Sequence, residues 1–472
     1  MKEPLQNMPY KKKLYSCNPK KDKKEIEVFV TKRKKLKRAI DATDVERGIR
    51  EILARKVSGT LLGISLLIPE HLRLGTWDLL KTWTADSGGI KTRLAMQMVH
   101  EAALCVTGIR ESRSLNHQGF EIANGLPFIA SDQEIHDLLD LHTIEEAKAI
   151  QISLALLRQS LGHYKGNLLA FDPHRIPTYS RRIMVKKKSH PRESSKPVLQ
   201  TFFCVDAQTG QPLSFILGSS GKTAAKSSIE LMQMLDRILP SKDHVDLLAD
   251  TEHESQLLLD YIIDSNKYEI LMPASRRKKV VELIQTLPYE RHWPGYATAE
   301  TDYKYEQSKN SFRLIGQRSG EKDYEYKPFL ATGNSPPVEL ITEKFPERWT
   351  IEEFFNFEGA IGWNRASTLN LNIRYGKMTL ALIAQAVTHQ LKKKLSVPYK
   401  NWTADHLANS VFRGIDGDLR VKDDTIIVTL YNAPESINLK KHYENLPEKL
   451  EGEGIDPRVP WLFNYKVDFR FK

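Results

Sequence analysis

Residues 168–177 read LLAFDPHRIP, and residues 247–255 read LLADTEHES. In each stretch an apolar run is followed directly by an aspartate, Asp172 in the first and Asp250 in the second. A short apolar run bounded by polar residues is typical of a buried strand. We therefore expect each carboxylate at the tip of a strand, where its side chain faces a cleft rather than the core.

The segments around these two aspartates predict a mixed sheet. The pattern indicates a hairpin at 201–205 and 212–217, then a helix at 224–239, a strand at 245–249, a helix at 254–263 and a strand at 268–272. Three antiparallel strands extended by parallel strands through helical crossovers form an α/β, ribonuclease-H-like sheet flanked by helices. In that layout the middle of the first strand lies beside the carboxyl end of the fourth, so Asp172 and Asp250 converge.

The rest of the chain divides by composition and periodicity. Capping-box spacings at Ser131 with Glu134 and at Thr143 with Glu146 support helices in the front half. Short aromatic-rich runs with glycine turns predict a small β insertion at about 286–335. We expect a basic flexible arm at 1–40, an all-α DNA-binding domain at 41–165, a catalytic domain at 166–395 and a mixed α/β region at 396–472.

A third acid is expected from the segment FPERWTIEEFF at 345–355, which opens a helix after the insertion. Arg348 and Glu352 lie one turn apart on the same helix face, although such a pair can also be a plain surface ion pair. Glu353 is the second choice for the third acid because it is turned about 100° round the helix, and Glu358 lies off that face. Asp206 competes with Asp172, but it sits at a hairpin turn, where aspartate has a local reason to be.

Three converging carboxylates suit a hard divalent cation. Mg²⁺ takes oxygen ligands, retains waters and shares its shell with phosphates, and two such ions can promote cleavage of a phosphodiester. We therefore expect Asp172, Asp250 and Glu352 to bind two Mg²⁺ ions, with Mn²⁺ as a substitute.

The formal charge of +11 points to a polyanionic partner, foremost nucleic acid. The segment from 175 to 196 is expected to form a basic loop that follows a DNA backbone, although a solvated loop is an equal alternative. Trp293, Trp349 and Trp363 could stack on an extruded base, or belong to the core. The candidate DNA contacts in these segments are Arg175, Arg181, Arg182, Lys186, Lys187, Lys188, Arg348 and Trp349.

Other classes of protein fit less well. The three cysteines have no CxxC spacing, so neither a disulfide framework nor a zinc site is indicated. No apolar run is long enough to span a bilayer, and a soluble cytoplasmic protein at the nucleoid is expected. The stretch GSSGKT at 218–223 suggests a P-loop, but Ile216 stands where the first glycine of that motif belongs.

The three blocks LLAFDPHRIP, LLADTEHES and FPERWTIEEFF resemble those of DDE transposases of bacterial insertion sequences, in the branch with a β insertion before the glutamate. The resemblance implies metal-dependent cleavage at transposon ends, transfer of the freed strand into double-stranded target DNA, and a homodimer in a synaptic complex. Phe345 and Gly359 depart from the tyrosine and lysine of that branch. Phosphate contacts are then expected from Arg365, Arg374 or Lys377.

Two alternatives remain open from the sequence. One is a catalytically inactive relative of a transposase that binds DNA as a repressor. The other is a ribonuclease-H-like nuclease that cuts DNA but does not join it.

Overall fold

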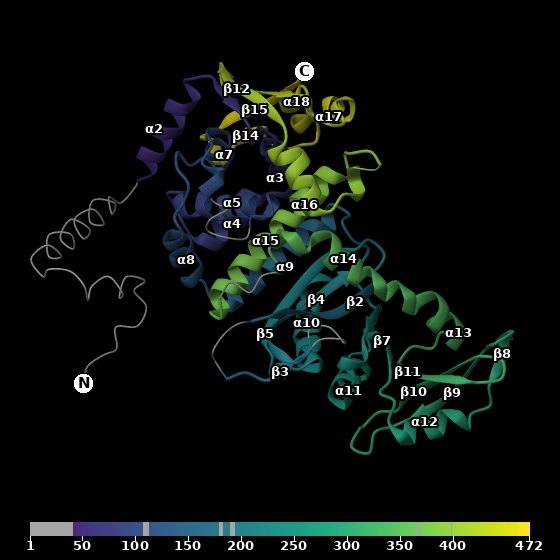
Figure 1. The fold of residues 1–472 in the computed structure, drawn as a ribbon. Helices are drawn as coiled ribbons and strands as arrows, with labels where there is room; N and C mark the ends of the chain where they lie inside the picture. The colour runs from purple at the N-terminus through teal and green to yellow at the C-terminus, as the bar shows by residue number, and fades with distance from the viewer. Residues whose placement is uncertain (1–40, 107–112, 179–182, 189–193, 365–367, 398) are drawn as a thin grey trace, which may run out of the picture.

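The computed structural model describes residues 41–106, 113–178, 183–188, 194–364, 368–397 and 399–472. Its main feature is a 10-stranded sheet with the order β3-β4-β2-β6-β7-β11-β10-β9-β8, and β5 also pairs with β4 (Figure 1). The strands of its first half are β2 (Leu168–Pro177), β3 (Lys186–Lys187), β4 (Lys196–Asp206), β5 (Gln211–Ser219), β6 (Val245–Ala249) and β7 (Tyr268–Pro273).

The order and direction of five of these strands define the fold class. Strands β5, β4 and β2 are antiparallel neighbours, and β2, β6 and β7 are parallel neighbours. The parallel connections run through α10 (Ala224–Ile238) and α11 (Gln256–Ser265). This is the ribonuclease-H-like mixed sheet expected from the sequence, including the hairpin of β4 and β5.

Strand β2 is longer than its apolar run predicts. It continues from Asp172 to Pro177, so Asp172 lies in the middle of a strand and not at a strand tip, and Arg175 belongs to the strand and not to a loop. Beyond Phe171 the strand pairs only with β4, because its pairing with β6 ends there. The edge that faced β6 is then free of ladder hydrogen bonds, and the two prolines of β2 are tolerated there.

The predicted β insertion is present and extends the same sheet. Strand β11 pairs antiparallel with β7, and the insertion projects as a lobe from the body of the molecule (Figure 1). Its elements are α12 (Lys278–Gln285), β8 (Glu290–Trp293), β9 (Tyr296–Tyr303), β10 (Phe312–Ser319) and β11 (Glu325–Ala331).

Helices cover both faces of the sheet because each central strand is apolar on both sides. Phe203 and Phe215 pack in the cluster that includes α14 (Thr350–Glu358) and α15 (Leu371–Lys392). Phe202 and Ile216 pack on the opposite face with residues of α10 and α11. The chain reaches α14 from β11 through α13 (Pro337–Glu339), the π-helix η4 (Leu340–Lys344) and the 3-10 helix η5 (Phe345–Trp349).

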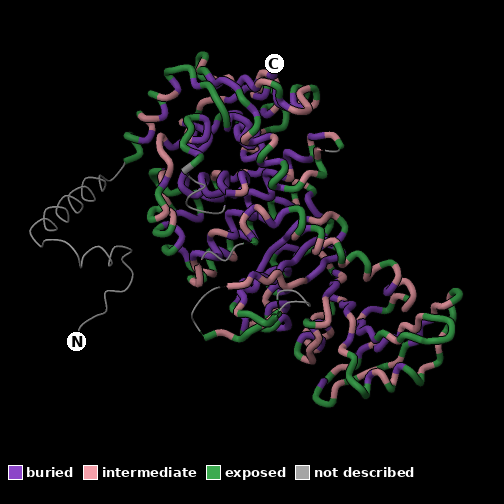
Figure 2. The backbone as a smooth tube through the Cα atoms, in the orientation of Figure 1, coloured by how far each residue is buried: buried purple, intermediate pink, exposed green. Residues whose placement is uncertain are grey.

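The N-terminal helices and the C-terminal strands share one hydrophobic cluster, which runs from Val45 to Phe471 (Figure 2). A 5-stranded sheet of order β1-β12-β13-β15-β14 joins the two regions. The N-terminal elements are α2 (Ala42–Leu53), β1 (Val57–Gly59), α3 (Ile68–Leu74), α4 (Thr76–Thr84), α5 (Ile90–Ala103), α7 (Gln118–Asn124), α8 (Asp132–Asp140) and α9 (Ile144–Ser160). The C-terminal elements are α16 (Ala404–Leu407), β12 (Asp416–Lys422), β13 (Thr425–Tyr431), α17 (Ser436–Tyr443), α18 (Leu446–Gly452), β14 (Arg458–Val459) and β15 (Tyr465–Phe471).

Polar contacts reinforce this shared cluster. Glu70 on α3 is fully buried, and its carboxylate accepts from Lys394 Nζ at 2.5 and 2.6 Å and from Tyr443 OH at 2.6 Å. Arg73 Nη1 donates to the same carboxylate at 3.0 Å. Both expected capping boxes are formed at the starts of α8 and α9. None of the helices in the described ranges is long and apolar enough to cross a membrane.

Candidate active site

The first two acids occupy matching positions on neighbouring parallel strands. Phe171 of β2 is the register partner of Ala249 of β6. Asp172 is the next residue of β2, and Asp250 follows directly after the end of β6. Asp172 pairs across β2 and β4 with Phe203, so the two side chains share a face of the sheet. Phe203 packs on Phe354 of α14, with ring centroids 5.4 Å apart. Asp172 therefore lies on the face that α14 covers.

The third acid comes from α14. Helix α14 contacts β2, and the preceding helix η5 contacts both β2 and β6. Glu352 lies in the first turn of α14, where its Oε1 accepts from Arg348 Nη2 at 2.9 Å. Both side chains are partly buried, so this pair differs from an exposed surface ion pair. Helix α14 brings the carboxylate of Glu352, and helix η5 brings the guanidinium of Arg348, to strands β2 and β6.

The electrostatics of Asp172 show that these groups act on one another. Burial raises the pKa of the Asp172 carboxyl from its ordinary 3.8 to about 7, and the positive charge of Arg348 opposes that rise. The negative charges of Asp250, Glu352 and Glu252 raise the pKa further. Like-charged carboxylates that share a site disfavour one another's ionisation. Asp250 and Glu352 are therefore near enough to Asp172 to affect its ionisation. Among the described residues, however, the group of three whose possible metal-ligand atoms lie within 4.8 Å of one another is a different one, His244, Asp246 and Glu269.

The competing acids have other roles. Glu353 is exposed on α14, and Glu358 forms a buried ion pair with Lys392, with Nζ and Oε1 2.8 Å apart. Asp206 is fully buried, and its two oxygens accept from four backbone N–H groups at 2.7 to 3.0 Å. Two of the donors, Gln208 and Thr209, belong to its own turn, and the other two, Lys165 and Gly166, precede β2, so its contacts are structural.

The turn that follows Asp250 is fixed to three neighbouring elements. Asp250 caps the 3-10 helix η3 (Thr251–His253), with its Oδ1 accepting from Thr251 N at 2.7 Å. Glu252 forms an ion pair with Arg175 of β2, and His253 Nδ1 lies 2.7 Å from Ser228 Oγ on α10. Glu254 contacts the insertion. The sequence analysis missed these anchors, although the acidic spacing of DTEHES at 250–255 is a signal that could have indicated them.

The candidate basic contacts lie in different surroundings. Arg175 points away from Asp172, and its Nε donates to Gln200 at 3.3 Å in addition to the Glu252 pair. Lys187 Nζ also donates to Gln200 Oε1, at 3.2 Å. Among the others, Lys186 and Lys188 are exposed in or beside β3, Lys377 is half-buried on α15, and Arg181, Arg182 and Arg365 lie outside the described residues.

The three candidate tryptophans differ in burial. Trp363 is fully buried against Phe203, with ring centroids 5.3 Å apart, and so belongs to the core. Trp349 is 57% exposed directly beside Arg348. Trp293 is 45% exposed at the end of β8 and stacks on Tyr296 at 4.3 Å. Trp349 and Trp293 therefore retain surface that a further group could contact.

Phe345 and Gly359, the two departures from the expected motif, each fit their surroundings in the structure. The Phe345 ring lies 5.8 Å from the Arg348 guanidinium, so it still supports that side chain. A Cβ at Gly359 would lie 2.5 Å from Nδ2 of Asn364, whose Oδ1 is 3.1 Å from His174 Nε2. A lysine at 359 would have to displace Asn364. Arg374 is buried, and its Nη1 has no hydrogen-bond partner.

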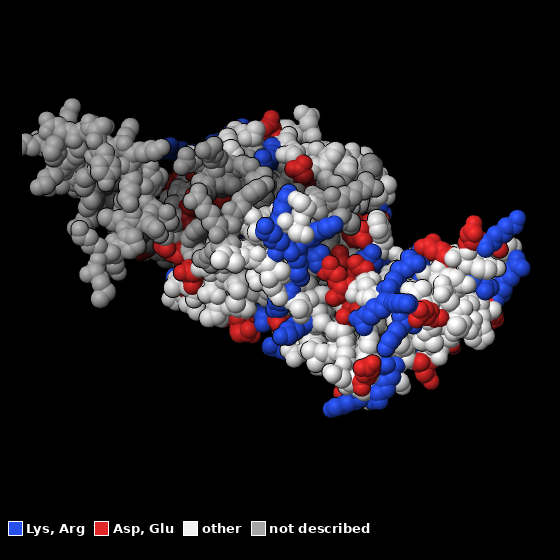
Figure 3. Space-filling model, turned by 60° about the horizontal axis from the view of Figure 1, so that its bottom comes forward, with Lys and Arg blue, Asp and Glu red and all other residues white. Residues whose placement is uncertain are grey.

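The surface around the acids is divided by charge. Acidic side chains gather between the insertion lobe and the body of the molecule, and lysines and arginines lie on both sides of them (Figure 3). A cavity of about 520 Å³ lies at the junction with the insertion and is lined by Thr251, Ser275, Arg276, Gln317 and Lys327, among others. A polyanion that entered between the two positive areas would pass these acidic side chains.

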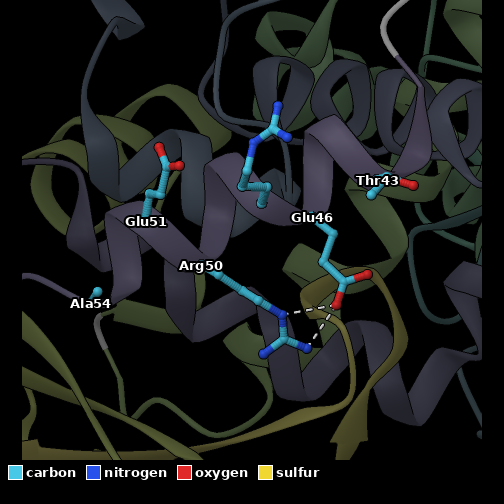
Figure 4. Close-up of a pocket in the computed structure, with 6 residues that line it drawn as sticks. Thr43, Glu46, Arg50, Glu51 and Ala54 are labelled. Carbon is cyan, nitrogen blue, oxygen red and sulfur yellow. Dashed lines mark hydrogen bonds and ion pairs between the residues drawn. The ribbon is translucent and has the colours of Figure 1, made fainter.

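A second pocket, of about 430 Å³, lies on the surface of α2 (Figure 4). Arg50 points across it to Glu46, with Nε and Oε1 2.8 Å apart. It contains no cluster of acids comparable with the one at Asp172. The carboxylate cluster is therefore the better candidate for chemistry.

The fold and the cluster together define a ribonuclease-H-like domain with two strand aspartates and a helix glutamate at one sheet edge. Residues 163–386 match the family described as the transposase DDE domain. This stretch is therefore similar to a transposase DDE domain, and it contains Asp172, Asp250 and Glu352. None of the curated proteins compared by sequence matches the chain.

Three solved structures show distant similarity. The piggyBac transposase synaptic complex with hairpin DNA is 11% identical, with coverage of 76% of this chain and 82% of that chain and a TM-score of 0.41. The Mos1 mariner paired end complex with Mn is 14% identical, with coverage of 34% and 58% and a TM-score of 0.17. The NurA nuclease from Sulfolobus solfataricus is 12% identical, with coverage of 56% and 94% and a TM-score of 0.21. The fold assignment rests on the strand order given above.

Proposed function

We propose that this protein is a metal-dependent transposase that cleaves DNA at transposon ends and joins the freed strand to target DNA. The observation that carries the proposal is that Asp172 lies near enough to Asp250, Glu352 and Arg348 for their charges to act on it. It is supported by the position of Asp172 on the sheet face that α14 covers. The stretch at 163–386 that matches the transposase DDE domain contains all four residues.

The donor set fits divalent cations. Asp172, Asp250 and Glu352 offer only carboxylate oxygens, which are the ligands that Mg²⁺ and Mn²⁺ accept. Burial and the neighbouring negative charges raise the pKa of Asp172 to about 7, and a bound cation would favour its ionised form. These three residues would hold two ions. When bound, such ions supply activation of a water or a 3′-hydroxyl and stabilisation of the leaving oxygen of a phosphodiester.

The side chains around the cluster have complementary tasks. Arg348 is held by Glu352 and is partly buried, so its remaining N–H groups can bind a DNA phosphate in a fixed orientation. The basic areas on either side of the acids would follow the DNA backbone, because phosphate contacts position the duplex without reading its sequence. The protein would act on the nucleoid as a homodimer that holds two transposon ends, with the N-terminal helical domain at 41–165 contributing DNA contacts.

The test is cleavage of a DNA duplex taken from the flanks of the protein's own gene, with Mg²⁺, with Mn²⁺ and with EDTA. We expect nicking and strand transfer with either metal and no reaction in EDTA. Glu352→Gln should abolish both reactions, whereas the matched change Glu353→Gln should preserve them. Cleavage without joining would favour a nuclease, and metal-independent DNA binding without cleavage would favour a repressor. Equal activity of the two glutamine variants would refute the assignment of Glu352.

A further inference from the structure

Glu254 connects the turn that carries Asp250 to the β insertion. Its side chain is only 4% exposed, and its Oε2 accepts from the backbone N–H of Ser275 at 2.5 Å. Its Oε1 accepts from Tyr305 OH at 2.5 Å and faces Arg277 Nη2 at 3.2 Å. A buried carboxylate with three donors is costly to disturb, because each lost partner leaves a polar group unsatisfied.

The three donors belong to the insertion and its entry. Ser275 and Arg277 lie between β7 and α12, and Arg277 occupies the N-cap position of α12. Tyr305 lies in the connection between β9 and β10, where its ring packs on Phe312 at 5.2 Å. The Arg277 guanidinium also lies 5.7 Å from the Tyr305 ring. Glu254 therefore holds both the entry and the inner loop of the insertion.

The backbone of Glu254 belongs to the turn that follows Asp250. Its backbone N–H donates to Thr251 O at 3.0 Å, and His253 N donates to Asp250 O at 3.0 Å. Thr251 in turn donates to the Asp250 carboxylate at 2.7 Å. The path from the insertion to Asp250 is therefore a continuous series of hydrogen bonds. Thr251 and Ser275, which both take part in this series, also line the cavity of about 520 Å³.

We infer that Glu254 is a positioning residue, whose carboxylate couples the β insertion to Asp250 and keeps Asp250 in place to bind a divalent cation. The inference rests on the proposed function, because it assumes that Asp250 is a metal ligand. Groups that orient ligands from behind are worth about 10- to 100-fold in metal affinity. Glu254 acts through the turn and not on the Asp250 carboxylate directly, so we expect the lower end of that range.

The experiment compares Mn²⁺ binding to the full-length protein by electron paramagnetic resonance, in the absence of DNA. Glu254→Gln has one acceptor oxygen where the native side chain has two, and should weaken Mn²⁺ binding by about tenfold. Tyr305→Phe removes a single donor and keeps the ring, so a smaller loss in the same direction is expected. It also serves as the second variant should Glu254→Gln fail to fold.

Asp260 offers a matched control. Its Oδ1 on α11 accepts from Ser308 Oγ at 2.5 Å, so it docks the same loop as Tyr305 but lies outside the Asp250 turn. Asp260→Asn should bind Mn²⁺ as the wild type does. A folded Glu254→Gln or Tyr305→Phe variant with wild-type Mn²⁺ affinity would overturn the inference, as would an equal loss in Asp260→Asn. Wild-type protein that binds no Mn²⁺ would instead overturn the proposed function.

Discussion

Replacing Asp172 with asparagine should abolish activity and yet stabilise the metal-free protein at pH 8. In the folded state burial and the neighbouring acids raise the pKa of Asp172 to about 7, and in the unfolded chain it returns to about 3.8. Between these values the folded protein binds a proton that the unfolded chain has lost. The contribution of Asp172 to the free energy of unfolding is therefore fully present below about pH 4 and is lost as the pH rises through about 7. Asparagine resembles the protonated acid at every pH.

The size of the effect follows from the same pKa difference. A change of one pH unit in a pKa corresponds to about 1.4 kcal/mol, so the rise from 3.8 to about 7 gives a ceiling of ~4 kcal/mol. Solvent at the partly exposed edge of the site reduces that value. We expect Asp172→Asn to increase the free energy of unfolding by about 2 to 4 kcal/mol at pH 8 and by nearly nothing at pH 4.

The assay is thermal unfolding in EDTA at pH 4, 6 and 8, with a parallel series in Mn²⁺. Without metal the melting temperature of Asp172→Asn should exceed that of the wild type increasingly from pH 4 to pH 8. With metal the wild type should gain stability and the variant should not, because only the wild type binds the ion in its folded state. Asp206→Asn is the control, since it loses acceptors for backbone N–H groups and should be destabilised at every pH.

One result would refute this reasoning. If Asp172→Asn is no more stable than the wild type at pH 8 in EDTA, the carboxylate is neither buried nor held near other negative charges as the structure places it. The cluster inferred from the structure would then not exist in solution.

Three further predictions concern single residues. Arg348→Ala should weaken binding of end DNA and lower the slope of log Kd against log salt by about one, as read by fluorescence anisotropy, because one phosphate contact is lost; an unchanged slope would contradict that role. Glu70→Gln should lower the free energy of unfolding by about 3 to 5 kcal/mol in urea titrations, since Lys394 loses a buried partner, and a change below 1 kcal/mol would contradict a structural role. Gly359→Lys should destabilise the protein by about 1 to 3 kcal/mol in the same titrations, since it displaces Asn364, and a stabilised variant would show that the site has room for a lysine.

Strands β4 to β7 of the central sheet could be predicted because each contains a short apolar run near turn residues, whereas β3 lies in the stretch expected to be a basic loop. The end of β2 could not, because Pro173 and Arg175 read as loop residues. They remain in the strand only because β4 continues alongside it after β6 has ended. Strand β1 has three residues and pairs with β12 across most of the chain, so no local pattern could reveal it.

The candidate site also has residues that the sequence could predict and residues that it could not. Asp172 and Asp250 could be predicted because each follows an apolar run directly, and Glu352 because it lies one turn after Arg348 in a helix that opens after the insertion. The anchors of the Asp250 turn could not be predicted. Glu252 meets its partner 77 positions away and Glu254 meets Tyr305 51 positions away, and only the folded topology brings such groups together.

The shared cluster of the N-terminal helices and C-terminal strands has a consequence for biosynthesis. Arg93 donates to the backbone of Trp461, 368 positions later in the chain. At a translation rate of about 5 to 20 residues per second, the early helices wait on the order of tens of seconds for these partners. During that interval apolar side chains of the early helices lack their final cover and are open to chaperones and proteases. A polypeptide released before β12 is complete would leave them in that state permanently.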